Sequence, residues 1–124
     1  MGLFGAIFGG GTKLQPTSVR TVEQFRAEVL GSELPVIVDV WSDTCPPCRK
    51  LWPVMVQIAT KYQGRVKVAE INTYAEPALL ASLGVMATPT VIIFDQGEEY
   101  GRTTGFRPPS WFEEMIEAEF PEEG

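Results

Sequence analysis

The chain contains no histidine among its 124 residues. The absence of imidazole excludes histidine acid–base catalysis and the Ser-His and Cys-His nucleophile pairs, and it removes the commonest zinc ligand. The two cysteines alone cannot complete a tetrahedral metal site within one chain. We therefore expect no metal centre, and the one arrangement left open is a site shared between two chains.

Positive charge is also scarce. Ten Lys and Arg residues stand against sixteen Asp and Glu residues, which gives a formal charge of −6, and most of the acidic excess follows Asp95. There is no basic stripe to neutralise phosphates, so we do not expect a nucleic-acid partner. We interpret the acidic end as a solvated helix face.

No apolar run is long enough to span a bilayer, and the first residues lack the basic region of a secretory signal. We therefore expect a cytoplasmic protein. In a reducing compartment, two cysteines that are two residues apart are more often catalytic than structural.

The length fits one domain with one core. Residues 1–12 stand apart, because they combine many glycines with the large apolar side chains of Leu3, Phe4, Ile7 and Phe8. We expect residues 1–14 to form a flexible apolar, glycine-rich arm and residues 15–121 to form the domain. The alternative for residues 1–12 is a segment that contacts a membrane surface or a partner.

Hydrophobic periodicity predicts alternating strands and helices. The expected strands cover residues 35–41, 65–71, 90–94 and 99–104, and residues 13–19 could hold an edge strand. The expected helices cover 21–31, 46–62, 77–83 and a last segment starting at 110. Capping boxes are expected at Thr21 with Gln24 and at Ser110 with Glu113. This order favours an α/β protein with a mixed sheet and helices on both faces.

The two cysteines, Cys45 and Cys48, lie where a buried strand turns into a helix. Unpaired N–H groups and the positive end of the helix dipole favour a thiolate at Cys45. Cys48, one turn further, is expected to be more buried and close enough to complete a two-step thiol–disulfide exchange. Pro46 and Pro47 suit the first helical turn, although they leave one fewer backbone donor near the Cys45 sulfur than a glycine would.

Asp39 is the second informative residue, because it interrupts an otherwise apolar strand. Burying a carboxyl group is costly and raises its pKa. If Asp39 points at the base of the helix, it can take the proton of Cys48 through a water molecule. The alternative is a structural carboxylate bonded to backbone or hydroxyl groups.

Four segments together resemble the thioredoxin family. Residues 38–53 resemble its active-site segment, 87–90 the loop with its cis-proline, 94–98 its hairpin turn, and 104–106 the glycine before its last helix. The resemblance covers roughly residues 17–120. It implies the thioredoxin fold, with a central mixed five-stranded sheet flanked by four helices.

The resemblance also implies roles for individual residues. Cys45 is implied as the nucleophile, Cys48 as the resolving thiol and Asp39 as the buried acid that assists it. Pro89 is implied to be cis and to expose backbone that pairs with an extended substrate. The implied substrate-binding residues are Trp41, Thr44, Pro46, Pro47, Ala87, Thr88, Pro89 and Gly105.

Three positions depart from the family pattern. Pro46 replaces the usual glycine, Thr44 replaces the tryptophan before the first cysteine, and Glu70 replaces a lysine near the buried acid. If Glu70 faces Asp39, we predict that the pKa of Asp39 is higher than in typical members and that resolution is slower at neutral pH.

The function implied is that of a protein-disulfide reductase. It would take electrons from a thioredoxin-reductase-type donor, pass them to disulfide-containing proteins and work as a monomer. No bound cofactor is expected, because the disulfide itself carries the electrons. Two alternatives stay open: a disulfide oxidant or isomerase, and a non-catalytic binding or assembly subunit with the same fold.

Overall fold

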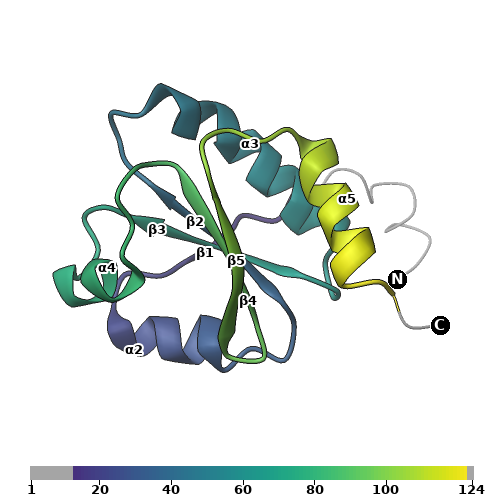
Figure 1. Cartoon of the computed structure of the whole chain (residues 1–124), viewed down its shortest axis with the longest axis horizontal. Coiled ribbons are helices and arrows are strands. Elements are labelled where there is room, and N and C mark those ends of the chain that lie inside the picture. Colours follow the sequence, from purple (N-terminus) through teal and green to yellow (C-terminus); the bar gives the residue numbers. More distant parts are fainter. Residues whose placement is uncertain (1–12, 123–124) are drawn as a thin grey trace.

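The computed structural model describes residues 13–122 of the chain, and Figure 1 shows the arrangement of its elements. The elements are β1 (Thr17–Ser18), α2 (Val22–Phe25) with its π-helical continuation η2 (Arg26–Leu30), β2 (Val36–Trp41), α3 (Pro46–Lys61), β3 (Lys67–Asn72), α4 (Pro77–Leu83), β4 (Thr90–Asp95), β5 (Glu98–Thr104) and α5 (Pro109–Glu119). The order of elements confirms the expected α/β fold class.

The five strands form one mixed sheet with the order β1-β3-β2-β4-β5. β3 pairs in parallel with both β1 and β2, whereas β4 is antiparallel to β2 and β5 is antiparallel to β4. The β4–β5 hairpin turns at Gln96 and Gly97, both with positive φ angles, as a tight turn between twisted strands requires.

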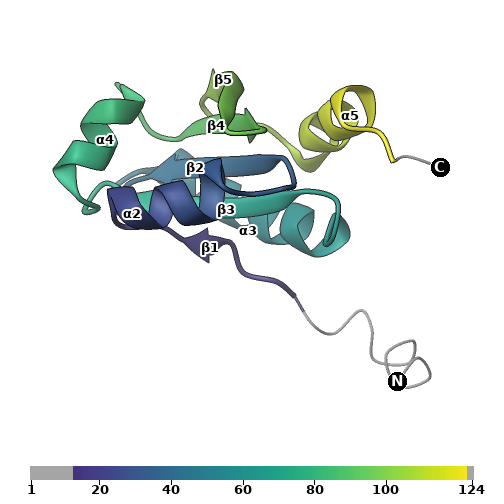
Figure 2. The same ribbon diagram turned by 90° about the horizontal axis from the view of Figure 1, so that it is seen from below.

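Helices cover both faces of the sheet (Figures 1 and 2). Side chains alternate between the faces along a strand, and β2 is buried on both. Its residues Val36, Val38 and Val40 belong to the core that includes residues of α2 and α4, whereas Ile37 belongs to the core under α3 and α5. Asp39, two residues after Ile37, therefore lies on the α3 face.

The first expected capping box is present in altered form. Thr21 Oγ1 accepts the Gln24 N–H at 3.0 Å, but Gln24 Oε1 accepts the N–H of Arg20, at 2.7 Å, rather than that of Thr21. The box expected at Ser110 and Glu113 is wrong. Helix α5 begins at Pro109 and follows Pro108, which makes no side-chain cap. Proline is favoured at the first helical position, so Ser110 lies inside the helix.

Residues 13–19, which could hold an edge strand, contain the short strand Thr17–Ser18, which pairs with β3 at the edge of the sheet. Residues 1–12, for which an apolar arm is expected, lie outside the described residues. Within residues 13–122, none of the helices is both long enough and apolar enough to cross a membrane.

Candidate active site

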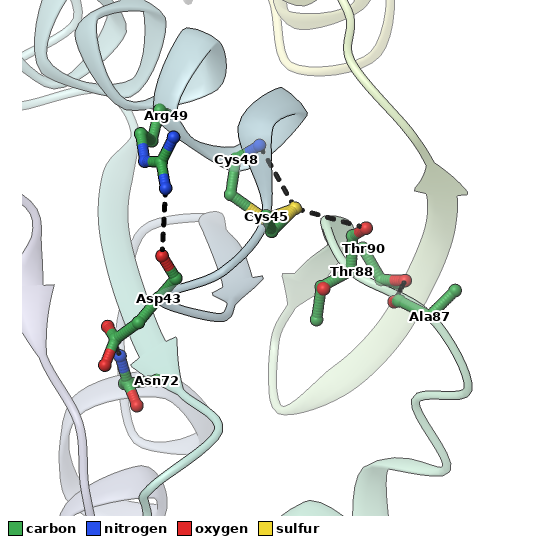
Figure 3. Close-up of a disulfide and its surroundings, with 8 residues drawn as sticks. All are labelled: Asp43, Cys45, Cys48, Arg49, Asn72, Ala87, Thr88 and Thr90. Atoms are coloured by element: carbon green, nitrogen blue, oxygen red, sulfur yellow. Dashed lines mark hydrogen bonds between the residues drawn. A yellow bond between two sulfur atoms is a disulfide. The ribbon is translucent and has the colours of Figure 1, made fainter.

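Cys45 and Cys48 form a disulfide at the start of α3, as Figure 3 shows. Cys45 is the residue that caps this helix, and Pro46 and Pro47 fill the first helical positions. Because neither proline has an N–H group, the first N–H of the helix belongs to Cys48, and it donates both to the Cys45 sulfur at 3.2 Å and to the Cys45 carbonyl oxygen at 3.0 Å. When the disulfide is reduced, this donor and the helix dipole favour a thiolate at Cys45.

The two sulfur-bearing residues differ in accessibility, as expected. Cys45 is 7% exposed and Cys48 is 3% exposed, while Thr44, Pro46 and Pro47 around them are exposed. A partner therefore reaches Cys45 first. Cys48 is shielded but remains within bonding distance of Cys45, which is the arrangement that a resolving thiol needs.

The loop before β4 lies against the other side of Cys45 (Figure 3). The Thr88–Pro89 peptide bond is cis, in agreement with the expectation, and the Thr88 carbonyl oxygen lies 3.4 Å from the Cys45 sulfur. The Thr90 hydroxyl donates to the Ala87 carbonyl oxygen at 2.6 Å, and the Gly105 N–H donates to the Pro89 carbonyl oxygen at 2.8 Å. These bonds fix the loop beside the disulfide.

Ala87 is exposed, Thr88 is half-buried and Pro89 is buried. Gly105, at a φ of 94°, ties the turn after β5 to this loop. The structure thus brings Thr88 beside Cys45 and links Pro89 to Gly105. Trp41 lies elsewhere, in a groove on the Cys48 side of the disulfide.

This groove has a volume of about 380 Å³. Its lining residues are Trp41, Ser42, Asp43, Cys48, Arg49 and Trp52. The ring centroids of Trp41 and Trp52 lie 6.1 Å apart. The side chain of Asn72, at the end of β3, donates to Oδ1 of the lining residue Asp43 at 3.2 Å (Figure 3).

Sequence reasoning did not single out Trp52 as a site residue. The available signal was a large apolar residue four positions after Cys48, hence on the same side of the helix, but outside the buried stripe that Leu51 and Met55 define.

Asp39 is completely buried, and neither of its carboxyl oxygens has a hydrogen-bond partner within residues 13–122. Burial and, next, the negative charge of Glu70 raise its pKa from 3.8 to about 7. Glu70 is the register partner of Asp39 on β3, so it faces Asp39 as the sequence suggested.

Among residues 13–122, no three Cys, Asp or Glu side chains gather in a way that could hold a metal ion. The disulfide is the group in this site that can take up two electrons. A backbone N–H donates to the Cys45 sulfur, Cys45 is slightly more exposed than Cys48, and the residues beside Cys45 are exposed, so the arrangement is suited to thiol–disulfide exchange.

Comparison with known proteins agrees with this chemistry. The family model described as Thioredoxin matches residues 16–118. Thioredoxin 1 of Nostoc sp. is 36% identical over 97 residues, which cover 78% of this chain and 91% of the relative. The thioredoxin of Porphyra purpurea is 38% identical over 77% of this chain and 90% of its own. The thioredoxin of Synechocystis sp. is 38% identical over 75% of this chain and 87% of its own.

Proposed function

Since the chain belongs to the thioredoxin family, it is a thiol–disulfide oxidoreductase that reduces protein disulfides, and we propose that Cys45, Cys48 and Asp39 divide the reaction among them. The observation that carries this proposal is the disulfide at the start of α3, with the helix N–H of Cys48 on the Cys45 sulfur.

The Cys45 thiolate attacks one sulfur of the substrate disulfide. The bond between the two substrate sulfurs breaks, the leaving sulfur takes the electron pair, and a mixed disulfide with Cys45 forms. Cys48 then loses its proton, attacks Cys45 and releases the second substrate thiolate. The substrate has gained two electrons, and the protein ends with the Cys45–Cys48 disulfide. Asp39, which lies on the sheet face that α3 covers, accepts the Cys48 proton through an intervening water when it is in its ionised form.

Substrate docking uses the surface around Cys45. The exposed residues Thr44, Pro46, Pro47 and Ala87 supply a largely uncharged platform. The cis-proline loop is held in place by Gly105, and its backbone beside Cys45 suits an extended substrate segment that adds main-chain hydrogen bonds. Trp41 forms the wall of the site on the Cys48 side.

The family implies a reductase as electron donor and protein disulfides as substrates. We assign a thioredoxin-reductase-type donor to this chain, a cytoplasmic location, a monomeric domain over residues 15–121, and no cofactor besides the disulfide. The deficit of positive charge supports the absence of a nucleic-acid partner.

The test is the reduction of insulin disulfides by the dithiol form. The wild type is expected to turn over with dithiothreitol as donor. The reduced Cys48→Ser variant, mixed with insulin after dithiothreitol has been removed, is expected to stall as a mixed disulfide visible by mass spectrometry, and the matched Cys45→Ser control forms none. A wild type that neither turns over nor traps substrate contradicts the proposal and favours an assembly subunit. A reduction potential near about −270 mV supports a reductant, and one nearer about −120 mV indicates an oxidant.

A further inference from the structure

Two acidic side chains lie next to each other in the dry interior. Asp39 on β2 and Glu70 on β3 are register partners in parallel strands, so both side chains project from the same face of the sheet. Asp39 is fully buried and Glu70 is 8% exposed. Two neighbouring carboxylates cannot both stay ionised cheaply at such a place, so one of them is expected to hold a proton.

The hydrogen bonds show which one. Glu70 Oε1 accepts the indole N–H of Trp41 at 2.6 Å, so this carboxyl group has a hydrogen-bond partner. Neither oxygen of Asp39 has such a partner within the described residues. Asp39 is therefore the member of the pair that holds a proton more readily, and its pKa of about 7 makes it about half protonated at neutral pH.

No other charge is placed to change this assignment within residues 13–122. On β4, the register partner of Asp39 is Val91, and on β2 the neighbours on the same face are Ile37 and Trp41. From α3, Cys48 does not titrate while it is in the disulfide, and burial raises the pKa of Tyr62, which follows α3 in the core on this face, above its usual 10.0. Glu70 is the one ionisable side chain whose charge acts on Asp39.

We propose that Glu70 is a positioning residue whose charge adds to the effect of burial, so that Asp39 still carries a proton in a large part of the molecules at neutral pH and assists the reduction of the Cys45–Cys48 disulfide more than the release of substrate. This inference rests on the proposed function. When a donor thiolate attacks Cys45, the Cys45–Cys48 bond breaks and Cys48 leaves with the electron pair. The proton of Asp39 passes to Cys48 through water, and the second donor thiol then resolves the mixed disulfide and leaves the donor oxidised.

In the opposite half-reaction the same proton is an obstacle. Cys48 must give up its proton before it attacks the mixed disulfide, and a protonated Asp39 cannot accept it. Release of substrate therefore accelerates as the pH rises through the range in which Asp39 ionises, about 7.

Glu70 also holds the ring of Trp41, which lines the groove beside Cys48. A variant must therefore separate the charge of Glu70 from its hydrogen bond. Glu70→Gln removes the charge and keeps a side-chain oxygen for the Trp41 indole. Glu70→Ala removes both and serves as the comparison for a purely structural role.

The test follows the two half-reactions separately by rapid mixing between about pH 5.5 and 9. The first is the reduction of the oxidised protein by dithiothreitol, and the second is the reduction of excess insulin by the reduced protein in a single turnover. In Glu70→Gln, the pH midpoint of the second half-reaction is expected to fall by about one unit, and its rate at pH 7 to rise several-fold. The Asp39→Asn variant should lack the pH step that Asp39 produces.

Equal midpoints in the wild type and Glu70→Gln overturn the inference while insulin reduction itself continues, whereas a wild type that reduces no insulin contradicts the proposed function. A second measurement needs no variant. The carboxyl carbon of Asp39 in the oxidised protein is expected to titrate near pH 7 by NMR. A midpoint below about 5 shows that Asp39 is ionised at neutral pH and overturns the inference as well.

Discussion

At the scale of single residues, the site combines features that were visible in the sequence with contacts that were not. The cysteine pair and Asp39 stand out by residue type, because a thiol pair and a carboxyl group are unusual in such apolar surroundings. The hydrogen bond from Trp41 to Glu70 could not be predicted from residue types, since it joins side chains 29 positions apart. Trp52 was missed for the same reason, because its groove exists only once α3 packs beside the end of β2.

Asp39 should make the stability of the fold depend on pH in the direction opposite to most acids. Its pKa rises from 3.8 to about 7 in the folded chain, so the folded state binds the proton more tightly. The protonated Asp39 therefore stabilises the folded state relative to the unfolded state fully below about pH 4, and this contribution is lost as the pH rises through about 7. We expect urea unfolding of the oxidised proteins to show this loss as a difference between the wild type and Asp39→Asn. The free energy of unfolding of Asp39→Asn, relative to that of the wild type, should rise by up to roughly 4 kcal/mol between pH 4 and 8.

The comparison is made as a difference between the two proteins, because other groups titrate in both. Glu99 and Glu117, whose pKa values are lowered by hydrogen bonds from Arg102 and Arg65, contribute equally to the wild type and the variant. A difference that stays constant across this pH range would mean that Asp39 is already ionised in the folded protein.

At the scale of elements, hydrophobic periodicity located the strands and helices, and most errors concern their ends. The capping box at Ser110 failed because Pro109 fixes the backbone of the first turn one residue earlier. The π-helical geometry of η2, where the Gly31 N–H donates to the Arg26 carbonyl oxygen at 2.8 Å, has no distinct hydrophobic pattern of its own. Thr21, in contrast, acts as the cap that its spacing to Gln24 indicated.

Helix α4 ends in a residue whose replacement should be costly. Gly84 has φ 64° and ψ 32°, the left-handed conformation, and its N–H donates to the carbonyl oxygens of Leu80 and Ala81. A Cβ atom at Gly84 would meet nothing within 4 Å, so the cost of Gly84→Ala is backbone strain alone, about 1–2 kcal/mol.

The matched control is Gly101→Ala in β5, where a Cβ atom also meets open space and the φ angle is not positive. Thermal or urea unfolding should place this control within about 0.5 kcal/mol of the wild type. If both variants lose the same free energy of unfolding, the loss in Gly84→Ala does not come from its left-handed backbone conformation.

At the scale of the whole molecule, the sheet separates two cores, and the redox site belongs to one of them. The α3 face carries Asp39, the buried side of α3 and the packing of α5. Strand order was not derivable from periodicity, which says only that both faces are covered. The resemblance of four short segments to a known family implied a mixed five-stranded sheet, and the structure has such a sheet, with the order β1-β3-β2-β4-β5.

Phe112 anchors α5 in this core. It is completely buried and belongs to the cluster that contains Leu51 and Met55 of α3. Phe112→Ala is expected to lower the free energy of unfolding by about 3–5 kcal/mol, through lost burial and the cavity that remains. Urea unfolding measures this loss, and Phe106→Ala, at a side chain that is 40% exposed, is the control expected to lose much less. Similar losses in the two variants would contradict this role of Phe112.

The two outer strands also set how this molecule behaves among copies of itself. One edge, β1, pairs through only two residues, and the other, β5, is mostly exposed and carries the Glu99–Arg102 ion pair beside a register shift at Ile93 and Phe94. Short, charged and irregular edges offer a poor template for another strand. A sheet that ends in this way resists growth into cross-β aggregates, so the chain can be concentrated without its edges recruiting further strands.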